Sequence, residues 1–487
     1  MKNNYKKIVL AGLSFMILGQ SCNKYLDKAP DNRTEINSVE KVAQLVATAY
    51  PTADYLTFTE AASDNAEDKG NGVGSIDDVT TRPYFWQDVI GSGTSSATAY
   101  WNGCYEGIAA ANQALEAINT QSFGNEVLPY KGEALVARAY AHFMLVTLYS
   151  KAYVIGGTND SPGIPYVTEP ETEVIKQYQR GTVASTYDKI EKDLTEGLAL
   201  LSASAYKVPK YHFTPAAAHA FASRFYLFKG DWQKVIEHAN AVSSNFATEI
   251  RLTNSALFNL STDEFNQAFT RSDQKFNLLL ANQYAAYQRQ SSPRYGYGEK
   301  LVAMFGVSGN ITGKSYANKI LSYGVPNYTT YKYREYFFVT NQISNIGLPY
   351  MMSPLITTDE TLMNRAEAYV KLGQYANALA DVNTMLSVTV RSYTATDAAT
   401  LAKVATYYKT TDAAQGLISL ILDVKKAQFL QEGIRWLDIL RNRITVRHNV
   451  FDAQGVETFI ELTPDDNRRV FQIPEEALLS GVPLNPR

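Results

Sequence analysis

The sequence predicts a mostly α-helical protein in which helical hairpins support a loop-rich face with a few short strands. Several stretches repeat apolar residues at spacings of three and four, the period of a helix with one buried face. Two of these stretches break at a glycine and then resume the same spacing. Long segments rich in Gly, Asn, Ser, Thr, Pro and Tyr separate the helices, and they predict ordered loops.

The expected helices follow one another along the chain. The buried face of the first includes Tyr105, Ile108, Asn112, Leu115 and Ile118, and that of the second includes Leu135, Ala139, Phe143 and Val146. The third runs over 218–228 and resumes over 235–242, the fourth runs over 362–369 and resumes over 376–386, and the fifth runs over 417–437. Because each has one apolar side, each is expected to face the core.

Two of the breaks share one pattern. Tyr226 is followed, after three residues, by Gly230-Asp231-Trp232, and Tyr369 is followed at the same spacing by Gly373-Gln374-Tyr375. Glycine accepts the left-handed backbone that closes a helix, and the aromatic residue fills the angle between two helices. The spacing resembles the tetratricopeptide repeat. Two copies are too few for a regular solenoid, so we expect helical hairpins embedded in a larger body.

Three segments have little helical period and are too long to be simple connectors: 60–100, 250–350 and 445–487. Long ordered loops usually carry function. Two short alternating pieces within them, 337–339 and 459–462, predict small strands.

Charge and cysteine content exclude several classes of protein. The 487 residues include 45 Lys and Arg against 48 Asp and Glu, for a formal net charge of −3. This balance provides no basic surface for nucleic acid, so no nucleic-acid partner is expected. The two cysteines, Cys22 and Cys104, offer no disulfide framework if Cys22 is modified.

The amino-terminal segment has the features of an export signal. Three lysines precede eleven mostly apolar residues, Ile8 to Leu18, and then Gly19-Gln20-Ser21-Cys22. The apolar run has signal-peptide length and is short for a membrane span. The residues before Cys22 resemble a bacterial lipobox, although Gly19 stands where leucine is usual. We expect removal of residues 1–21 and lipidation of Cys22, the alternative being an ordinary signal peptide with an incidental cysteine.

No motif indicates covalent chemistry or a transition metal. The five histidines include no His-x-x-x-His pair, and three residues separate Gly309 from Gly313 where a P-loop needs four. The Gly-x-Ser-x-Gly motif of serine hydrolases is absent. The run 64–71 contains oxygen ligands suited to calcium but lacks the alternation of an EF-hand. We therefore expect a solvated loop there and no cofactor, with calcium the one ion left open.

Five segments in order carry a family resemblance: Cys22 followed by Tyr25-Leu26-Asp27-Lys28-Ala29-Pro30, Trp101 to Ile108 followed by Ala111-Asn112, Glu133 to Tyr140, Glu360 to Tyr369, and Glu432 to Arg441. Together with Ile473-Pro474, they resemble the SusD/RagB family of nutrient-binding outer-membrane lipoproteins over essentially the whole chain. The chain departs from the family at Val424-Lys425 and Gln428-Phe429, where a Glu-Arg pair and a Glu-Leu are usual.

The resemblance implies a single domain over 22–487, with halves of about 22–250 and 251–487 and four tetratricopeptide-like hairpins. It also implies a lipid-anchored protein at the outer surface of a Gram-negative outer membrane. Members form the lid of a SusC-like TonB-dependent transporter, and they capture a glycan or peptide and deliver it without covalent chemistry. The chain is therefore not expected to be an enzyme. Four charged residues of the matching segments are expected to pair within the core: Arg138, Glu367, Glu432 and Arg435.

A sugar needs exposed aromatic faces flanked by Asn, Asp, Arg or Tyr. Residues 284–336 contain ten tyrosines in 53 residues of non-periodic sequence. In the resembled family, ligand contacts come from an early loop and a loop near the middle of the chain. The expected ligand-binding residues are Asn71, Trp86, Tyr284, Tyr287, Arg294, Tyr295 and Tyr297. Trp101 is expected to pack between helices.

The main hypothesis is a non-catalytic surface lipoprotein that binds a glycan. A peptide-binding member of the same family would use the same aromatic face with more charge and backbone-pairing edges. Two other classes stay open, an exported helical-repeat scaffold that binds only protein and a lipid-anchored glycoside hydrolase. The paired carboxylates of a hydrolase are not recognisable in the sequence because their separation is spatial.

Overall fold

Helices make up most of the regular structure in the computed structural model, which describes residues 36–487 except 90, 174, 288–291 and 331. The described α-helices are α3 (Val39–Val46), α4 (Leu56–Ala62), α5 (Asp78–Tyr84), α6 (Ala97–Thr120), α7 (Leu128–Tyr149), α8 (Val183–Leu198), α9 (Pro215–Lys229), α10 (Trp232–Val242), α11 (Thr262–Phe269), α12 (Glu299–Phe305), α13 (Thr358–Lys371), α14 (Tyr375–Thr389), α15 (Leu401–Tyr408), α16 (Ala413–Gln428) and α17 (Ile434–Arg441). The predicted helical class is confirmed. The leader and Cys22 lie outside the described residues.

The strands are few and mostly short. They are β1 (Glu67–Asp68), β2 (Asn277–Tyr284), β3 (Tyr295–Gly296), β4 (Ile320–Ser322), β5 (Tyr328–Thr330), β6 (Glu335–Asn341), β7 (Ile346–Thr357), β8 (Val446–Phe451) and β9 (Glu457–Leu462). The predicted strands at 337–339 and 459–462 lie within β6 and β9. The long strands β2 and β7 were not predicted, and they form an antiparallel sheet in the order β2-β7-β6.

The two glycine-centred hairpins are confirmed in backbone detail. Gly230 has φ +81° between α9 and α10, and Gly373 has φ +74° between α13 and α14. In both turns the carbonyl of the tyrosine accepts a hydrogen bond from the amide five residues later, Asp231 to Tyr226 at 3.0 Å and Gln374 to Tyr369 at 2.8 Å. The same residue spacing therefore closes both helices with the same backbone bond.

The expected fifth helix over 417–437 is wrong as one continuous element. α16 ends at Gln428 and α17 begins at Ile434, with Gly433 at φ +71° between them. A Cβ at Gly433 would lie 2.4 Å from Cε2 of Tyr55, so the turn depends on close approach to a segment near the start of the described chain. Apolar spacing carries no information about such a remote contact.

The expected loop segments also contain short helices, which the sequence analysis missed. α4 and α5 lie in 60–100 or at its edge, and α11 and α12 lie in 250–350. These helices have seven or eight residues each, which is too short for a clear period. The structure also adds α3, α8 and α15 to the predicted set.

Ion pairs link the helices inside the core. Arg138 binds Asp193 through its Nε at 2.7 Å, and Arg441 binds Glu367. Glu432 likewise pairs with Arg251, so the predicted structural role of these charges is confirmed. At the two positions that depart from the family pattern, Lys425 pairs with Asp438 at 2.6 Å and Gln428 donates to Asp359 at 2.8 Å.

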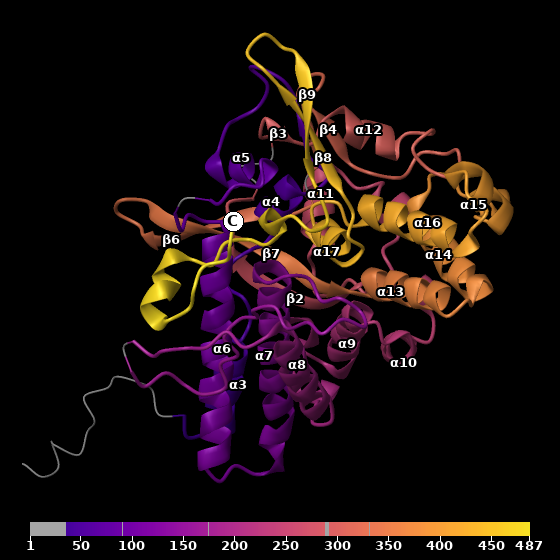
Figure 1. Ribbon diagram of the computed structural model, residues 1–487. Helices are drawn as coiled ribbons and strands as arrows, with labels where there is room; N and C mark the ends of the chain where they lie inside the picture. The colour runs from indigo at the N-terminus through magenta and orange to yellow at the C-terminus, as the bar shows by residue number, and fades with distance from the viewer. Residues whose placement is uncertain (1–35, 90, 174, 288–291, 331) are drawn as a thin grey trace, which may run out of the picture. The chain divides into compact units, whose positions relative to one another are not determined.

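Residues 39–487 form one compact unit, and Met1–Ser38 is a separate unit of which only residues 36–38 are described. In the larger unit, α6, α7 and α8 pack as neighbours, and the helices α9, α10 and α13 continue the stack beside them (Figure 1). The sheet β2-β7-β6 lies between this stack and the loops around the β8–β9 hairpin (Figure 1). None of the described helices is both long enough and apolar enough to cross a bilayer.

Candidate functional site

Residues 54–68, which we call the acidic segment, hold the loop-rich face together. They contain five acidic residues whose side chains bind other parts of the chain: Asp54, Glu60, Asp64, Glu67 and Asp68. A buried carboxylate is costly unless it is hydrogen-bonded or paired with a cation. Each of these contacts therefore fixes the position of a distant segment.

Glu60 is buried and accepts three hydrogen bonds through its carboxylate. Its carboxylate accepts hydrogen bonds from the Gly433 amide at 3.0 Å, from the Tyr297 hydroxyl at 3.0 Å and from the Asn65 amide at 2.9 Å. Burial raises the pKa of Glu60, and these three donors act against that rise. Glu60 thus joins the turn before α17 to the strand region around β3.

Asp64 and Asp68 each bind an arginine with both carboxylate oxygens. Arg435 lies 2.7 and 2.8 Å from Asp64, and Arg294 lies 2.7 and 2.9 Å from Asp68. Burial would raise the pKa of both carboxyls, but the guanidinium groups, helped by Lys426 at Asp64, hold both pKa values below their usual range. The expected solvated loop at 64–71 is therefore wrong for its first part, because residues 65–69 are buried and bonded.

This network brings together four of the seven predicted ligand-binding residues, three of which are buried and one of which, Arg294, is partly buried. Tyr287, Tyr295 and Tyr297 expose only 7–8% of their surface. Tyr295 packs on Tyr84 with 4.7 Å between the ring centroids, and the Arg294 guanidinium group forms an ion pair with the Asp68 carboxylate. The expectation that these rings present open faces is corrected, and ligand contact by them stays a prediction.

Asn71 and Trp86 lie nearby in different surroundings. Asn71 is exposed, and its amide donates to the Asp452 carbonyl at 2.7 Å. Trp86 is 5% exposed, stacks on His448 at 4.7 Å and donates its indole N–H to the Ala62 carbonyl at 3.0 Å. Trp101 packs edge-on against Tyr149, as expected for a residue between helices.

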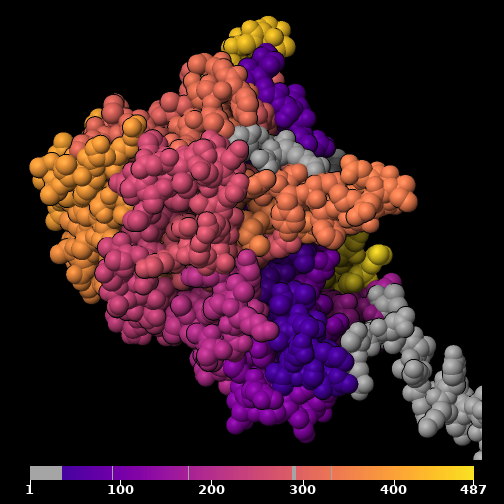
Figure 2. Space-filling view, turned by 180° about the vertical axis from the view of Figure 1, so that it is seen from behind, coloured from indigo at the N-terminus to yellow at the C-terminus, as the bar shows by residue number. Residues whose placement is uncertain are grey.

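Tyr284, the remaining predicted residue, belongs to a row of three tyrosines across the sheet. Tyr284 on β2 pairs with Tyr350 on β7, and Tyr350 pairs with Tyr336 on β6. Directly opposed residues share a face, and both neighbouring ring pairs have centroids 5.9 Å apart. Tyr336 is 45% exposed, and the β6–β7 hairpin projects from the surface (Figure 2). The register thus builds an accessible aromatic row.

The row borders an open hollow of about 710 Å³, which we call the tyrosine groove. Its walls come from the sheet, from the N-terminal half of α6 and from the segment after α3, and they include Tyr284, Tyr350, Asn102, Glu106, Asn282 and Tyr211. Glu106 is the single charged residue among the described lining residues, and it accepts a hydrogen bond from Thr52 at 2.6 Å. Asn102 is exposed and makes no side-chain hydrogen bond to the described residues.

These features suit an uncharged, hydroxyl-rich ligand. Tyrosine rings offer flat faces to the C–H groups of a sugar, and the Asn102 amide supplies a donor and an acceptor. The Asn282 side-chain oxygen already accepts the Tyr336 hydroxyl, which ties this amide to the aromatic row. The volume lies within the range of about 300–1,000 Å³ that is typical of ligand sites. No charged pair of opposing carboxylates lines the described part of the groove, since Glu106 is its single acid.

Sequence reasoning missed Tyr350, Tyr336, Asn102 and Asn282. Tyr336 ends the tyrosine-rich stretch 284–336, and Asn102 lies in one of the segments that carry the family resemblance. The signal that joins them is strand register, which becomes readable only when β2, β6 and β7 are known to pair.

Fold and groove together define a helical-hairpin binding protein with a carbohydrate-compatible aromatic surface. Two family models match the chain, one described as SusD-like, "starch-binding associating with outer membrane", over residues 24–227, and one described as the SusD family over residues 218–477. The second alone spans more than half of the chain. The protein therefore belongs to the SusD family, a family of carbohydrate-binding proteins associated with the outer membrane.

Solved structures show the same fold. A SusD-like carbohydrate-binding protein from Bacteroides vulgatus matches with a TM-score of 0.65 at 16% identity, covering 91% of this chain and 96% of its own. A SusD superfamily protein from Bacteroides thetaiotaomicron matches with 0.59 at 18% identity, covering 92% and 100%. A laminarin-binding SusD-like protein matches with 0.58 at 17% identity, covering 92% and 99%. No curated protein sequence matches significantly.

The placement of Arg294 generates a stability prediction. In Arg294→Leu the fully buried Asp68 side chain loses its cation, so the free energy of unfolding should fall by about 3 kcal/mol or more in urea denaturation. Arg447→Leu is the matched control, because the Arg447 side chain is 58% exposed and its loss should cost about 1 kcal/mol or less. Equal stability of the two variants would show that Asp68 does not depend on Arg294.

Proposed function

We propose that this protein is a non-catalytic nutrient-binding protein that captures a glycan in the tyrosine groove and passes it to a SusC-like TonB-dependent transporter. The observation that carries the proposal is the aligned row Tyr284-Tyr350-Tyr336 beside the unengaged amide of exposed Asn102 in a nearly uncharged groove. Membership of the SusD family and the fold shared with a laminarin-binding protein support the glycan as ligand class.

The chemistry of the groove favours a neutral oligosaccharide over a peptide. A peptide binder gains affinity from paired backbone edges and charged side chains. The described walls of the groove contain one acid and no lysine or arginine, and Tyr284 on β2 already bonds through its amide to the Thr52 carbonyl at 2.6 Å. The peptide-binding alternative therefore has less support at this site.

Binding of the mature protein to a panel of neutral oligosaccharides tests the site. Tyr350→Ala removes the central ring of the row, and Asn102→Ala removes an exposed amide, so each should weaken the best ligand about tenfold in isothermal titration calorimetry. Product analysis of the same mixtures should show intact sugar.

Tyr407→Ala is the matched control for the aromatic substitution. Tyr407 is 40% exposed on α15 and lines none of the groove, so its loss should leave glycan affinity unchanged. Saturable glycan binding that persists in both groove variants would place the site elsewhere, and cleavage of the sugar would overturn the non-catalytic role. A panel in which peptides alone bind would favour the second candidate.

Attachment to the outer membrane through Cys22 completes the proposal. The leader pattern and the family support a lipid on this residue, and acyl chains anchor at about 0.8 kcal/mol per buried methylene. In a Gram-negative host, Cys22→Ala should move the protein from the outer-membrane fraction to the soluble fraction, as followed by immunoblot. An unmodified wild-type Cys22 in mass spectrometry would contradict the anchor, and a tagged protein that never co-purifies with the transporter would contradict the delivery step.

A further inference from the structure

The projecting end of the β6–β7 hairpin, residues 336–348, which we call the apolar hairpin, exposes apolar side chains on both faces (Figure 2). Phe338 lies opposite Leu348, on the face that continues the tyrosine groove. Successive strand residues point to opposite faces, so Phe337 and Val339 belong to the other face. Seven large apolar residues of the hairpin are each at least 37% exposed: Tyr336, Phe337, Phe338, Val339, Ile343, Ile346 and Leu348. Such a group marks an interaction surface.

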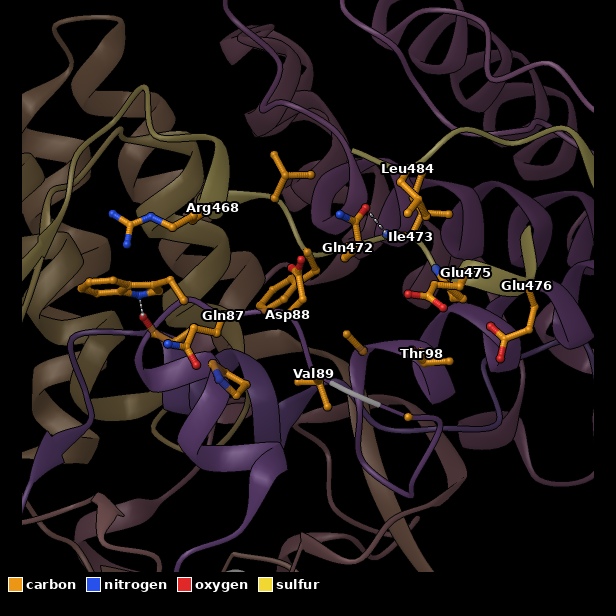
Figure 3. A pocket seen from close by; sticks show the side chains of 18 of the residues that line it. Gln87, Asp88, Val89, Thr98, Arg468, Gln472, Ile473, Glu475, Glu476 and Leu484 are labelled. Carbon is orange, nitrogen blue, oxygen red and sulfur yellow. Dashed lines mark hydrogen bonds between the residues drawn. The ribbon is translucent and has the colours of Figure 1, made fainter. Parts of the chain in front are cut away.

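The apolar hairpin also lacks charge, because residues 336–358 contain no Asp, Glu, Lys, Arg or His. Elsewhere a charged side chain covers an aromatic ring near the surface. In the hollow of about 340 Å³ beside Trp86, Arg468 lies over the Trp86 ring, with 5.8 Å from its guanidinium carbon to the ring centroid (Figure 3). Phe338 is 58% exposed, and no cation of the described residues lies over its ring. The hairpin therefore presents an uncharged apolar surface.

The turn at the tip of the apolar hairpin satisfies its own backbone groups. The Asn341 side-chain oxygen accepts hydrogen bonds from the amides of Ile343 at 3.0 Å and Ser344 at 3.3 Å, and the Thr340 hydroxyl donates to the Ile346 carbonyl at 3.1 Å. The Ile343 side chain is fully exposed. Backbone groups resist transfer out of water unless they are hydrogen-bonded, so these contacts reduce the cost of moving the tip into a less polar medium.

Exposure on two faces favours a lipid surface over a flat protein surface. A flat partner would cover one face of the apolar hairpin and leave the other in water. The interfacial region of a bilayer surrounds both faces and the tip, and it is where tyrosine side chains such as Tyr336 are enriched. The absence of charge fits the same environment, because charged side chains are costly in it.

The proposed anchor at Cys22 keeps the hairpin within reach of a bilayer. Cys22 lies 17 residues before Val39, where α3 begins, and a chain of that length spans at most about 60 Å when fully extended. Tethering raises the effective concentration of the bilayer around the protein, so a weak second contact is sufficient.

We propose that the apolar hairpin inserts shallowly into the interfacial region of a lipid bilayer, with Phe338, Ile343 and Ile346 as the inserted side chains. This second membrane contact orients the protein on the surface to which Cys22 attaches it, and in that respect it rests on the proposed function. Because β6 and β7 also carry two tyrosines of the row, insertion places the tyrosine groove close to the bilayer. The contact needs no anionic lipid, since the hairpin is uncharged.

The mature chain with Cys22→Ala tests insertion without the lipid, so failure of the anchor and failure of the hairpin are distinguishable. We expect this chain to co-sediment with unilamellar vesicles of phosphatidylcholine. Addition of phosphatidylglycerol to the vesicles should change the affinity by no more than about twofold, because no charge of the hairpin contributes. Absence of binding to both vesicles, or binding that requires phosphatidylglycerol, would overturn the proposal.

Two double variants in this chain locate the contact. Ile343→Ser with Ile346→Ser removes two apolar side chains that do not line the tyrosine groove, so vesicle binding should weaken at least about tenfold while glycan affinity stays unchanged. Val456→Ser with Phe459→Ser is the matched control on the β8–β9 hairpin, where both residues are about half exposed, and it should bind vesicles as before. Equal vesicle binding by the two double variants, with native circular dichroism, would contradict the assignment.

A fluorescence measurement reports insertion of the tip directly. Ile343→Trp should show a blue shift of its emission when phosphatidylcholine vesicles are added, whereas Val456→Trp should show none. No shift in the first variant, or equal shifts in both, would contradict insertion. Analytical ultracentrifugation tests a second copy as the occupant, because a dimer of the Cys22→Ala chain that the Ile343→Ser, Ile346→Ser variant abolishes would overturn the assignment to lipid.

Discussion

The burial of carboxylates in the acidic segment is the constraint on which the rest of the structure depends. Glu60 and Asp68 are buried and Asp64 is partly buried, so each must find donors or a cation inside the protein. The partners come from Arg294, Gly433 and Arg435, which lie 226 to 373 residues further along the chain. Residues 54–68 are thereby the point at which the early helices, the middle loops and the C-terminal helices meet.

The position of the tyrosine groove follows from this constraint. Just before the acidic segment, the Thr52 carbonyl accepts the Tyr284 amide, and the Gln283 side chain donates to the carbonyls of Pro51 and Ala53. These bonds fix the end of β2 against the start of the acidic segment. Because β7 pairs with β2 and β6 pairs with β7, the row of tyrosines is placed by the same contacts. The position of the tyrosine row therefore depends on contacts with residues 51–53, which directly precede the acidic segment.

Local patterns in the sequence predicted the longer helices α6, α7, α9, α10, α13 and α14, since a helix buries one face that repeats every three or four residues. The short helices and α8 were missed. The hairpin turns at Gly230 and Gly373 were also predictable, because glycine conformation is a local property. The break at Gly433 was not, because it depends on Tyr55. Tyr295 and Tyr297 looked like exposed loop residues for the same reason, as their burial depends on Tyr84 and Glu60.

The sequence predicted which types of residue form the candidate site better than it predicted their positions in the chain. Tyrosine enrichment in the middle of the chain predicted Tyr284 as a site residue, whereas the partners that make an accessible row, Tyr336 and Tyr350, depend on strand register. Asn102 comes from α6, far from the sheet in sequence, and it reaches the groove through tertiary packing. Arg294 was also predicted to contact a ligand, but in the folded protein its guanidinium group forms an ion pair with Asp68.

A crystal structure of the mature protein with its tightest-binding oligosaccharide tests the central claim most directly. The account predicts a sugar ring stacked on the Tyr284-Tyr350-Tyr336 row within hydrogen-bond distance of Asn102. A sugar bound elsewhere on the protein, with the tyrosine groove empty, would contradict it.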